Sequence, residues 1–450
     1  MKLRQRVLSH LRRRLDDALP LRLVFWDGQV FDFAPAPTVA LTLRTPRLLR
    51  LLLTGDMGRL AEAYVKGDIG VDGDLHDIIP IGVAMAERIG RSPLLARLGH
   101  LLGALRPRHS RGRDAAAISY HYDVSNAFYE LWLDRHMVYS CAYFLTGEED
   151  LDTAQEQKLD HLCRKLRLRP GERLLDIGCG WGGLVRWAAS HYGVAALGIT
   201  LSRPQAEFGR QRIAEAGLAG RAEIRYADYR DLEGAGDFDK IVSVGMYEHV
   251  GLANLPRYFD LIARNLKPGG MALNHGITSG DRDGHAQGPP GGEFIDRLVF
   301  PGGELPHLSR VIYEVAGAGL ETIDVEDLRP HYPQTLVRWV ERLEGSRDAA
   351  IAAAGEERYR IWRMYMTAMA YAFDCGWLSV AQVLTVKPGS HGPAARPWTR
   401  RYQYVPQAQA PLSRALDWRA DRRAREAPAT APSGLPVAGD AVAHAPAVLE

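Results

Sequence analysis

Residues 174–183 of the chain read LLDIGCGWGG. An apolar run enters a cluster of glycines, and residues 184–191 continue from it with a helical pattern. Because glycine has no side chain, it permits a sharp turn and lets a ligand approach the backbone closely. The stretch therefore predicts a strand, a tight turn and a helix start that bind a nucleotide-type cofactor. A tight turn without a ligand is the alternative, since a single glycine cluster is a weak signal.

Composition indicates a globular protein with local basic patches. The 450 residues are 46% hydrophobic and 24% charged, with a net charge of +2, which leaves room for two or three domains. Two basic patches suit an anionic surface; they comprise Lys2, Arg4, Arg6, Arg12, Arg13 and Arg14, and Arg106, Arg108, Arg111 and Arg113. No apolar run is long enough to span a bilayer, and the N-terminus lacks the features of a signal peptide. We expect a cytoplasmic protein that associates peripherally with the inner face of the cell membrane and binds no nucleic acid.

The four cysteines show no spacing typical of a metal site. Nothing indicates secretion, so we expect reduced thiols. Cys179 lies within the glycine turn and is not expected to act in catalysis.

The chain divides into four segments by composition. Residues 1–105 indicate a small α+β domain with a hairpin about Asp27-Gly28, which either dimerises or packs, or presents lipid. Residues 106–117 indicate a basic linker that contacts anionic headgroups or is a solvated tether. Residues 118–388 hold the chemistry-bearing motifs, and residues 389–450 are rich in Pro, Ala and Arg and indicate a disordered tail.

Strand and helix patterns alternate from about residue 160 to residue 268, which predicts a doubly wound, mostly parallel α/β sheet. The predicted strands are 173–177, 195–199, 222–226, 240–244 and 270–274, with a last strand at 382–387. Ligands bind such sheets beyond the carboxyl ends of the strands. The distinctive polar residues of the chain follow those ends.

The second strand is followed by Thr200, Ser202 and Gln205. Ser202 is a predicted N-cap, and Gln205 either contacts a ligand or completes a capping box. No acidic residue is present there to bind a ribose, so a nicotinamide dinucleotide is disfavoured. Glu248 and His275 follow neighbouring strands, and two ionisable residues beside a cofactor loop favour function over capping.

Two further segments indicate a cavity. The aromatic residues of 120–129 and 139–144 form either a core helix or a roof that stabilises a cation. Residues 279–305 place an apolar insert between glycine-rich flanks, which favours a lid over an apolar cavity.

In their order along the chain, the motifs resemble those of the cyclopropane-fatty-acyl-phospholipid synthase family, which includes the mycolic-acid cyclopropane synthases. They are HYD at 121–123, YSCAYF at 139–144, DIGCGWG at 176–182, GITLS at 198–202, DYRD at 228–231 and EHVG at 248–251. The match runs from about residue 24 to residue 387, and the first hundred residues resemble the extra N-terminal domain of the phospholipid-modifying members. Two positions depart from the family pattern, namely Met369, where many members have cysteine, and Ala381, where an aromatic residue is common. Both were placed on the pocket wall, where they would affect chain preference.

The resemblance implies a class I methyltransferase fold with a seven-stranded sheet and S-adenosylmethionine as the methyl donor. The implied cofactor contacts are Tyr139, Ser140, Gly178, Cys179, Gly180, Thr200, Leu201, Ser202, Gln205, Tyr229 and Arg230. It also implies a bound bicarbonate, held by Cys141, Glu248, His275 and Tyr332 with help from the backbone of Ile277.

The implied reaction is methylene transfer to the cis double bond of an unsaturated acyl chain in a membrane phospholipid, which forms a cyclopropane ring through a carbocation. Bicarbonate would take the proton, since a carboxylate placed against the cation would risk adding to it. Alternatives are a methyl-branched or methylene-bearing product, and a catalytically silent lipid-binding or cofactor-binding homologue. Plant amine N-methyltransferases also resemble the fold but would not need the first domain. A metal site built from Cys141, Glu248 and His275 is a weaker alternative, and a homodimer is possible.

Overall fold

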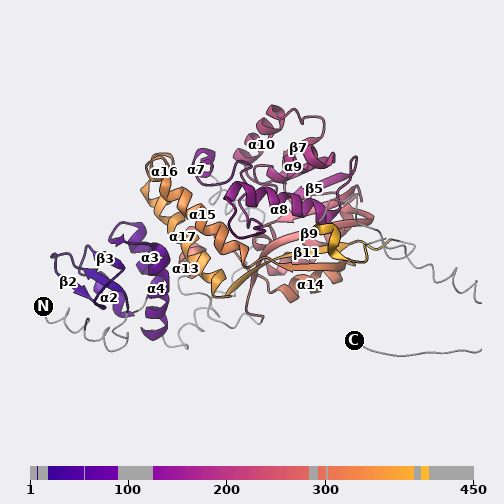
Figure 1. Cartoon of the computed structure of the whole chain (residues 1–450). Helices are drawn as coiled ribbons and strands as arrows, with labels where there is room; N and C mark the ends of the chain where they lie inside the picture. The colour runs from indigo at the N-terminus through magenta and orange to yellow at the C-terminus, as the bar shows by residue number, and fades with distance from the viewer. Residues whose placement is uncertain are drawn as a thin grey trace, which may run out of the picture.

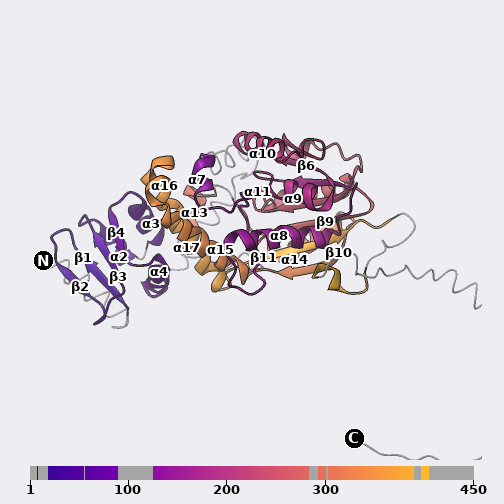
Figure 2. The same cartoon turned by 45° about the horizontal axis from the view of Figure 1, so that its top comes forward.

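The computed structural model describes residue 8 and residues 19–54, 56–89, 125–282, 292–300, 303–389 and 397–404. Within these residues lie a four-stranded and a seven-stranded sheet. Helices α15 (His331–Gly345) and α17 (Glu356–Asp374) lie between the two sheets in both views (Figures 1 and 2). Four predictions lie wholly or mostly outside the described residues: both basic patches, the linker at 106–117, the HYD motif at 121–123 and most of the tail.

The N-terminal unit, which we define as β1 to α4, is a small α+β module. Its sheet has the order β2-β1-β3-β4, with β1 and β3 parallel and the other pairs antiparallel. The elements are β1 (Leu21–Val24), β2 (Val30–Asp32), β3 (Val39–Leu43), α2 (Leu48–Thr54), α3 (Met57–Val65), β4 (Ile69–Asp72) and α4 (Leu75–Ile89). The predicted hairpin is confirmed, and Gly28 turns it with a φ of 78°. The sequence did not predict β3 or β4.

The larger sheet has the order β10-β11-β9-β8-β5-β6-β7. Its strands are β5 (Arg173–Ile177), β6 (Ala195–Thr200), β7 (Ala222–Tyr226), β8 (Phe238–Val244), β9 (Leu266–Ser279), β10 (Glu321–Asp327) and β11 (Leu378–Val386). β11 is antiparallel to both of its neighbours, and the remaining pairs are parallel. The predicted doubly wound, mostly parallel sheet is confirmed.

Helices cover both faces of this sheet. Leu174 packs into the apolar cluster on one face and Leu175 into the cluster on the other, because successive side chains of a strand point to opposite faces. The first cluster includes residues of α8 (Leu151–Leu166), α9 (Gly183–Tyr192) and α10 (Arg203–Glu215). The second includes residues of α12 (Leu255–Asn265) and α14 (Leu308–Gly317). Burial on both faces suits the apolar runs of β6 and β11, whereas the outer strands β7 and β10 are more polar.

One predicted strand end was wrong. The apolar pattern predicts that the fifth strand ends near residue 274, whereas β9 continues to Ser279 and pairs with β11 along most of its length. His275 therefore lies inside a strand, between Val244 of β8 and Gln382 of β11, rather than beyond its end. The pairing with β11, which is distant in sequence, extends the strand.

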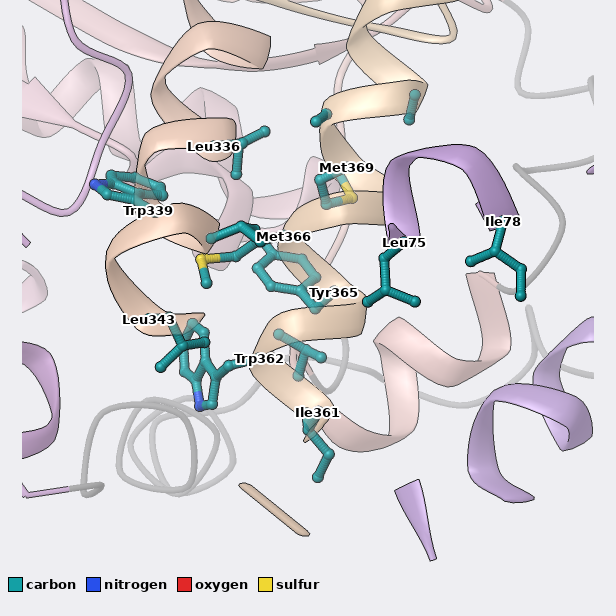
Figure 3. Packing of buried hydrophobic residues seen from close by; sticks show 14 of the residues in the cluster. Leu75, Ile78, Leu336, Trp339, Leu343, Ile361, Trp362, Tyr365, Met366 and Met369 are labelled. Atoms are coloured by element: carbon teal, nitrogen blue, oxygen red, sulfur yellow. The ribbon is translucent and has the colours of Figure 1, made fainter. Parts of the chain in front are cut away.

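A third apolar cluster joins the N-terminal unit to the C-terminal helices. It contains residues of β1, β3, α3 and α4 together with residues of α15 and α17. Figure 3 shows Leu336, Trp339 and Leu343 of α15 on one side of α17, and Leu75 and Ile78 of α4 on the other. Arg360 of α17 also donates to the Tyr64 carbonyl at 2.9 Å. The Met- and aromatic-rich helix α17 is thus a core element that both units share.

Part of the predicted tail is folded. Residues 397–404 include η3 (Arg400–Gln403), in which Tyr402 is buried. Gln403 Nε2 donates to Asp324 Oδ2 at 3.2 Å, and Arg400 Nε lies 2.6 Å from Asp324 Oδ1. This short segment packs against β10, in contrast to the expectation for residues 389–450.

Candidate active site

The glycine stretch forms the predicted strand, turn and helix. β5 ends at Ile177, and α9 begins at Gly183. Gly178, Gly180 and Gly182 have φ of 79°, 55° and 75°, a region that side-chain-bearing residues rarely adopt. A Cβ on Gly178 would lie 3.0 Å from Met246 Sδ, whereas one on Gly180 would meet no atom within 4 Å. The turn thus exposes bare backbone beside the start of a helix, which is an arrangement suited to a nucleotide-type ligand.

A cavity opens over this turn, and we call it the cofactor cavity. Nine of the eleven predicted cofactor residues line it: Tyr139, Ser140, Gly178, Cys179, Gly180, Thr200, Leu201, Gln205 and Tyr229. Ser202 and Arg230 do not. Ser202 Oγ instead accepts from the backbone N–H of Gln205 and caps α10, as predicted for an N-cap. Arg230 donates to Asp228 through Nε and Nη2, at 2.6 to 3.0 Å.

Gln205 adopts neither of its two expected arrangements in full. It lines the cofactor cavity, but its Oε1 accepts from Thr200 Oγ1 at 2.8 Å. The side chain does not return to the Ser202 backbone N–H, which donates to Thr200 Oγ1 at 3.2 Å. The Thr200–Gln205 pair forms one wall of the cavity and holds the entry to α10.

Lys158 and Asp176 were missed by the sequence analysis, and both line the cofactor cavity. Lys158 is 1% exposed, and its Nζ donates to Ser140 Oγ at 2.8 Å. Burial lowers the pKa of Lys158 to about 8 and raises the pKa of Asp176 to about 7. The sequence did carry a signal for Lys158. Gln155 and Lys158 lie on the same face of α8 as Leu151 and Leu162, and polar residues on an otherwise apolar helix face indicate a buried polar site.

A second cavity, which we call the central cavity, lies next to the cofactor cavity. The two share Tyr139, Ser140, Gly245 and His249 as lining residues. The central cavity has a volume of about 240 Å³. All five residues predicted to act in catalysis line it, together with apolar side chains from α13 (Gly292–Leu298), α17 and β11; the five are Cys141, Glu248, His275, Ile277 and Tyr332. The structure thus brings scattered positions to one largely apolar space beside the cofactor cavity.

Glu248 lies on α11 (Tyr247–Val250), directly after β8, and is 8% exposed. Its Oε1 accepts from the Ile277 backbone N–H at 2.7 Å, and its Oε2 is buried without a hydrogen-bond partner among the described residues. Burial raises the pKa of Glu248 to about 7, and the Ile277 N–H opposes that shift. The Ile277 N–H was predicted to bind an anion; in this geometry it holds Glu248 instead.

His275 reaches the cavity from β9 and is 1% exposed. Its Nδ1 lies 3.2 Å from Gln382 Nε2 of β11, and its Nε2 is buried and unpaired within the described part of the chain. With the Gln382 amide as the donor, Nδ1 accepts and the ring proton resides on Nε2. Burial holds the pKa of His275 well below its ordinary value, so the imidazole is neutral. Gln382 was placed on a strand by the sequence analysis but was not recognised as a site residue.

Cys141 and Tyr332 complete the set. Cys141 is fully buried, burial raises the pKa of its thiol, and its Sγ donates to the Ala142 carbonyl at 3.3 Å. Tyr332 lies at the start of α15, with its ring centroid 4.6 Å from that of Phe373. A neutral thiol, a neutral imidazole and a phenol are all hydrogen-bond donors. The unpaired Nε2 of His275 is one such donor, whereas the unpaired Oε2 of Glu248 is an acceptor, so the set fits a small oxyanion that also carries a hydroxyl group.

The described residues of the aromatic segments lie partly in the core and partly on the cavity walls. Phe128, Tyr129 and Trp132 are fully buried core residues. Tyr139 lines both cavities, with its ring centroid 5.1 Å from that of Trp339. The predicted lid segment supplies Ile295, Asp296, Phe300, Gly303 and Leu305 to the wall of the central cavity, while its residues 283–291 lie outside the described residues.

Of the two departures from the family pattern, only one lies where it was expected. Met369 lines the central cavity. Ala381 does not, although it is buried, because successive side chains of β11 point to opposite faces of the sheet and the neighbouring Val380 is the one that lines the cavity. Among the described residues, no three His, Cys, Asp or Glu side chains are grouped to hold a metal ion. None of the described helices is long and apolar enough to cross a membrane.

A family model described as mycolic acid cyclopropane synthetase matches residues 109–383, and a second model, described as a domain of unknown function, matches residues 9–91. The chain belongs to the mycolic acid cyclopropane synthetase family. It is 47% identical to a "Probable fatty acid methyltransferase" of Pseudomonas putida over 390 residues, which are 86% of this chain and 96% of that protein. It is 38% identical to the cyclopropane-fatty-acyl-phospholipid synthase of Escherichia coli (strain K12) over 264 residues, 59% of this chain and 66% of that protein.

A solved structure shows the same fold. The mycolic acid cyclopropane synthase CmaA1, complexed with SAH and CTAB, matches with a TM-score of 0.57 and 34% identity, and the match covers 63% of this chain and 100% of that chain. The expected class I methyltransferase fold is confirmed. The protein is an S-adenosylmethionine-dependent methyltransferase of the cyclopropane synthase family.

Proposed function

We propose that this protein transfers a methylene group from S-adenosylmethionine to the cis double bond of an unsaturated acyl chain in a membrane phospholipid. The main support is the junction of the two cavities. The cofactor cavity and the central cavity share Tyr139, Ser140, Gly245 and His249, so a methyl group in one would face an acyl chain in the other.

The central cavity suits an alkene, which is a poor nucleophile. Bound S-adenosylmethionine would supply an electrophilic methyl group at the shared wall. Apolar walls that hold the double bond in line with that methyl can lower the barrier by about 7 to 11 kcal/mol through positioning alone. Attack of the π electrons leaves a positive charge on the acyl chain. The rings of Phe300, Tyr332 and Tyr365 line the cavity, and aromatic faces can stabilise a cation by ~0.5 to 2 kcal/mol.

Ring closure requires that the transferred carbon lose a proton. Bicarbonate, when bound, would supply a small base at this position. Cys141, His275 and Tyr332 would donate hydrogen bonds to it, and Glu248 would orient it through the unpaired Oε2. Ile277 would act on Glu248, because its N–H holds the other carboxylate oxygen. The backbone N–H of Ile277 would thus orient the Glu248 carboxylate, and Glu248 would in turn orient the bicarbonate.

One observation favours a product other than the cyclopropane ring. The Pseudomonas putida relative, at 47% identity, is named for fatty acid methylation rather than for ring formation. The same cation gives a methylene-bearing chain if a hydride shifts to it from the methyl-bearing carbon and the methyl group then loses a proton. A separate hydride donor would be needed to reduce that alkene to a methyl-branched chain. A ring and an alkene have the same mass, so the product must be examined chemically.

The test uses labelled S-adenosylmethionine and vesicles of a monounsaturated phospholipid. The expected product is heavier by one methylene and takes up no hydrogen under mild catalytic reduction. A product of that mass that still takes up hydrogen supports the methylene alternative. The absence of any labelled lipid, with cofactor binding intact, would support a catalytically silent lipid-binding protein.

We also propose a peripheral location at an anionic membrane surface. The basic patches that motivate it lie outside the described residues. Sedimentation with neutral and anionic vesicles tests it, and binding that rises with anionic lipid and falls with salt is the expected result. A homodimer formed through the N-terminal domain remains part of this proposal, and light scattering measures it.

A further inference from the structure

A third cavity, which we call the N-terminal pocket, lies between the N-terminal unit and the C-terminal helices. Its volume is about 130 Å³. Leu60 of α3 and Ile78 of α4 form one side, and Met364, Ala368 and Met369 of α17 form the other. Figure 3 shows α4 and α17 beside each other at this place, with Ile78 and Met369 labelled. The pocket therefore lies outside the methyltransferase sheet and depends on both units.

The lining residues of the N-terminal pocket favour a hydrocarbon ligand over a charged one. Among its described lining residues there is no Asp, Glu, Lys, Arg or His, and the polar atoms come from Tyr64, Tyr371 and Trp377. A phosphate, a carboxylate or a nucleotide would lose its hydration there without gaining an opposite charge. The apolar segment of a lipid would instead gain free energy from every buried methylene.

The N-terminal pocket and the central cavity share a wall. Ile295 of α13 and Met369 of α17 line both. All the candidate catalytic side chains lie on the central side of these two residues, and none lines the pocket. The N-terminal pocket therefore adjoins the central cavity across Ile295 and Met369, and its lining would offer an entering chain mainly apolar contacts.

We propose that the N-terminal pocket holds the methyl-terminal segment of the reacting acyl chain. The methyl end is the part of an acyl lipid without a charged group, which matches a pocket without a charged side chain. The inference rests on the proposed function. It assigns to the N-terminal unit, which matches a family model of unknown function, a direct part in substrate selection.

The pocket can be filled from either side by a single substitution. Ala368 on α17 and Ala61 on α3 line the pocket and do not line the central cavity. Ala368→Phe and Ala61→Phe each add a ring to the space. Ala353→Phe, on the exposed face of α16 (Arg347–Ala354), is the matched control.

The assay uses phospholipids with the double bond at a constant position from the carboxyl group and with methyl-terminal segments of increasing length. For the unmodified protein and the control, each methylene that enters the pocket should lower KM about fourfold, equivalent to about 0.8 kcal/mol. In the filled variants this gain should disappear, so that KM for the longest segment rises at least about tenfold and KM for the shortest stays unchanged.

Two outcomes would overturn the proposal while leaving the proposed function intact. One is a KM that still falls with each added methylene in the filled variants as it does in the control, which would place the methyl-terminal segment elsewhere. The other is a dependence on the length of the second, unreacted acyl chain. If the unmodified protein methylates no lipid, the proposed function itself has failed.

A second measurement does not require the variants to fold. A monounsaturated phospholipid with a diazirine at the methyl end of its reacting chain is photolysed on the full chain in the presence of S-adenosylhomocysteine. Labelled peptides should come from α3, α4 and residues 364–377 of the unmodified protein. Labelling confined to peptides of the central cavity would overturn the proposal.

Discussion

The Glu248 carboxyl links catalysis to stability. Its pKa rises from 4.5 to about 7 because it is buried, so the folded state binds its proton more tightly than the unfolded state does. The free energy of unfolding therefore falls as pH rises from about 4.5 to 7, and the ionised carboxylate costs about 3 kcal/mol above this range.

Glu248→Gln should separate the effect of Glu248 on turnover from its effect on the free energy of unfolding. The amide keeps an oxygen for the Ile277 N–H but removes the negative charge. Turnover should fall about 100-fold or more, while affinity for S-adenosylhomocysteine stays within about twofold. Above pH 7 the variant should be more stable than the unmodified protein by about 3 kcal/mol, and below pH 4.5 the two should be equal.

Urea unfolding at a series of pH values measures the stability difference. A variant that is less stable at neutral pH, or one that retains full turnover, would contradict the role given to Glu248. Glu341→Gln on the exposed face of α15 is the control, and it should change neither property.

Tyr332→Phe tests the phenol alone. The ring keeps its packing against Phe373, so the free energy of unfolding should change by less than about 1 kcal/mol. Removal of the hydroxyl takes away one donor to the proposed anion, and turnover should fall about tenfold or more. Radiometric assay and thermal unfolding of this variant and of Tyr313→Phe, whose side chain is 69% exposed, provide the comparison. Equal turnover in the two variants would remove Tyr332 from the site.

At the scale of elements, the turn between β5 and α9 was the most predictable part. Its glycines predict a positive φ and the close approach of a ligand to the backbone. Both properties depend only on the local sequence. The parallel strands β5, β6 and β8 were predictable for a similar local reason, since each carries a short apolar run between helices. β10 and the extension of β9 to Ser279 were not, because they depend on pairing with β11, which lies about a hundred residues away from β9 in the chain.

The site residues also divide into those that the sequence predicted and those that only the folded structure revealed. Motif order led to Cys141, Glu248, His275 and Tyr332, and the structure places all four on one cavity. The sequence did not indicate Gln382 as a site residue. A single glutamine within an apolar strand carries no functional signal by itself, and its contact with His275 depends on the pairing of β11 with β9. Ser202 and Arg230 matched the motifs, but their side chains are engaged in a helix cap and in pairing with Asp228.

Gly178→Ala tests the turn as an element. The substituted residue must hold a φ of 79°, which costs about 1 to 2 kcal/mol, and its Cβ would also press on Met246, a residue of the cofactor cavity. Gly171→Ala is the matched control, because Gly171 has a φ of 83° and its Cβ would meet no atom within 4 Å.

Both variants should lose stability by about 1 to 2 kcal/mol, and only Gly178→Ala should also lose cofactor affinity, by about tenfold. Calorimetric titration with S-adenosylhomocysteine distinguishes them. Unchanged affinity in Gly178→Ala would mean that the turn is structural only.

At the scale of the whole molecule, α17 joins two parts that composition alone would separate. Its buried face packs against α15, α3 and α4, and the largest apolar cluster runs without interruption from the N-terminal sheet to the aromatic residues near Tyr139. Arg363 of α17 also donates to Tyr64 Oη at 3.1 Å. Because the N-terminal unit is small, this contact adds to the apolar surface that it can bury.

The two parts should therefore unfold together. Leu75 of α4 is fully buried in the shared cluster, so Leu75→Ala should lower the free energy of unfolding by about 2 to 5 kcal/mol. Leu145→Ala, at a side chain that is 63% exposed, should change it by less than about 0.5 kcal/mol.

Urea unfolding followed by far-UV circular dichroism and by tryptophan fluorescence should give coincident transitions in the unmodified protein and in Leu75→Ala, since Trp339 and Trp362 belong to the shared cluster. If Leu75→Ala instead produces an early transition that leaves tryptophan fluorescence unchanged, the N-terminal unit folds independently. In that case the N-terminal pocket, which needs walls from both units, could open without unfolding of the sheet, and the dependence of KM on acyl-chain length should weaken in the same range of urea. Coincident transitions with an intact dependence on chain length would establish that one cooperative core maintains both the fold and the proposed route of the acyl chain.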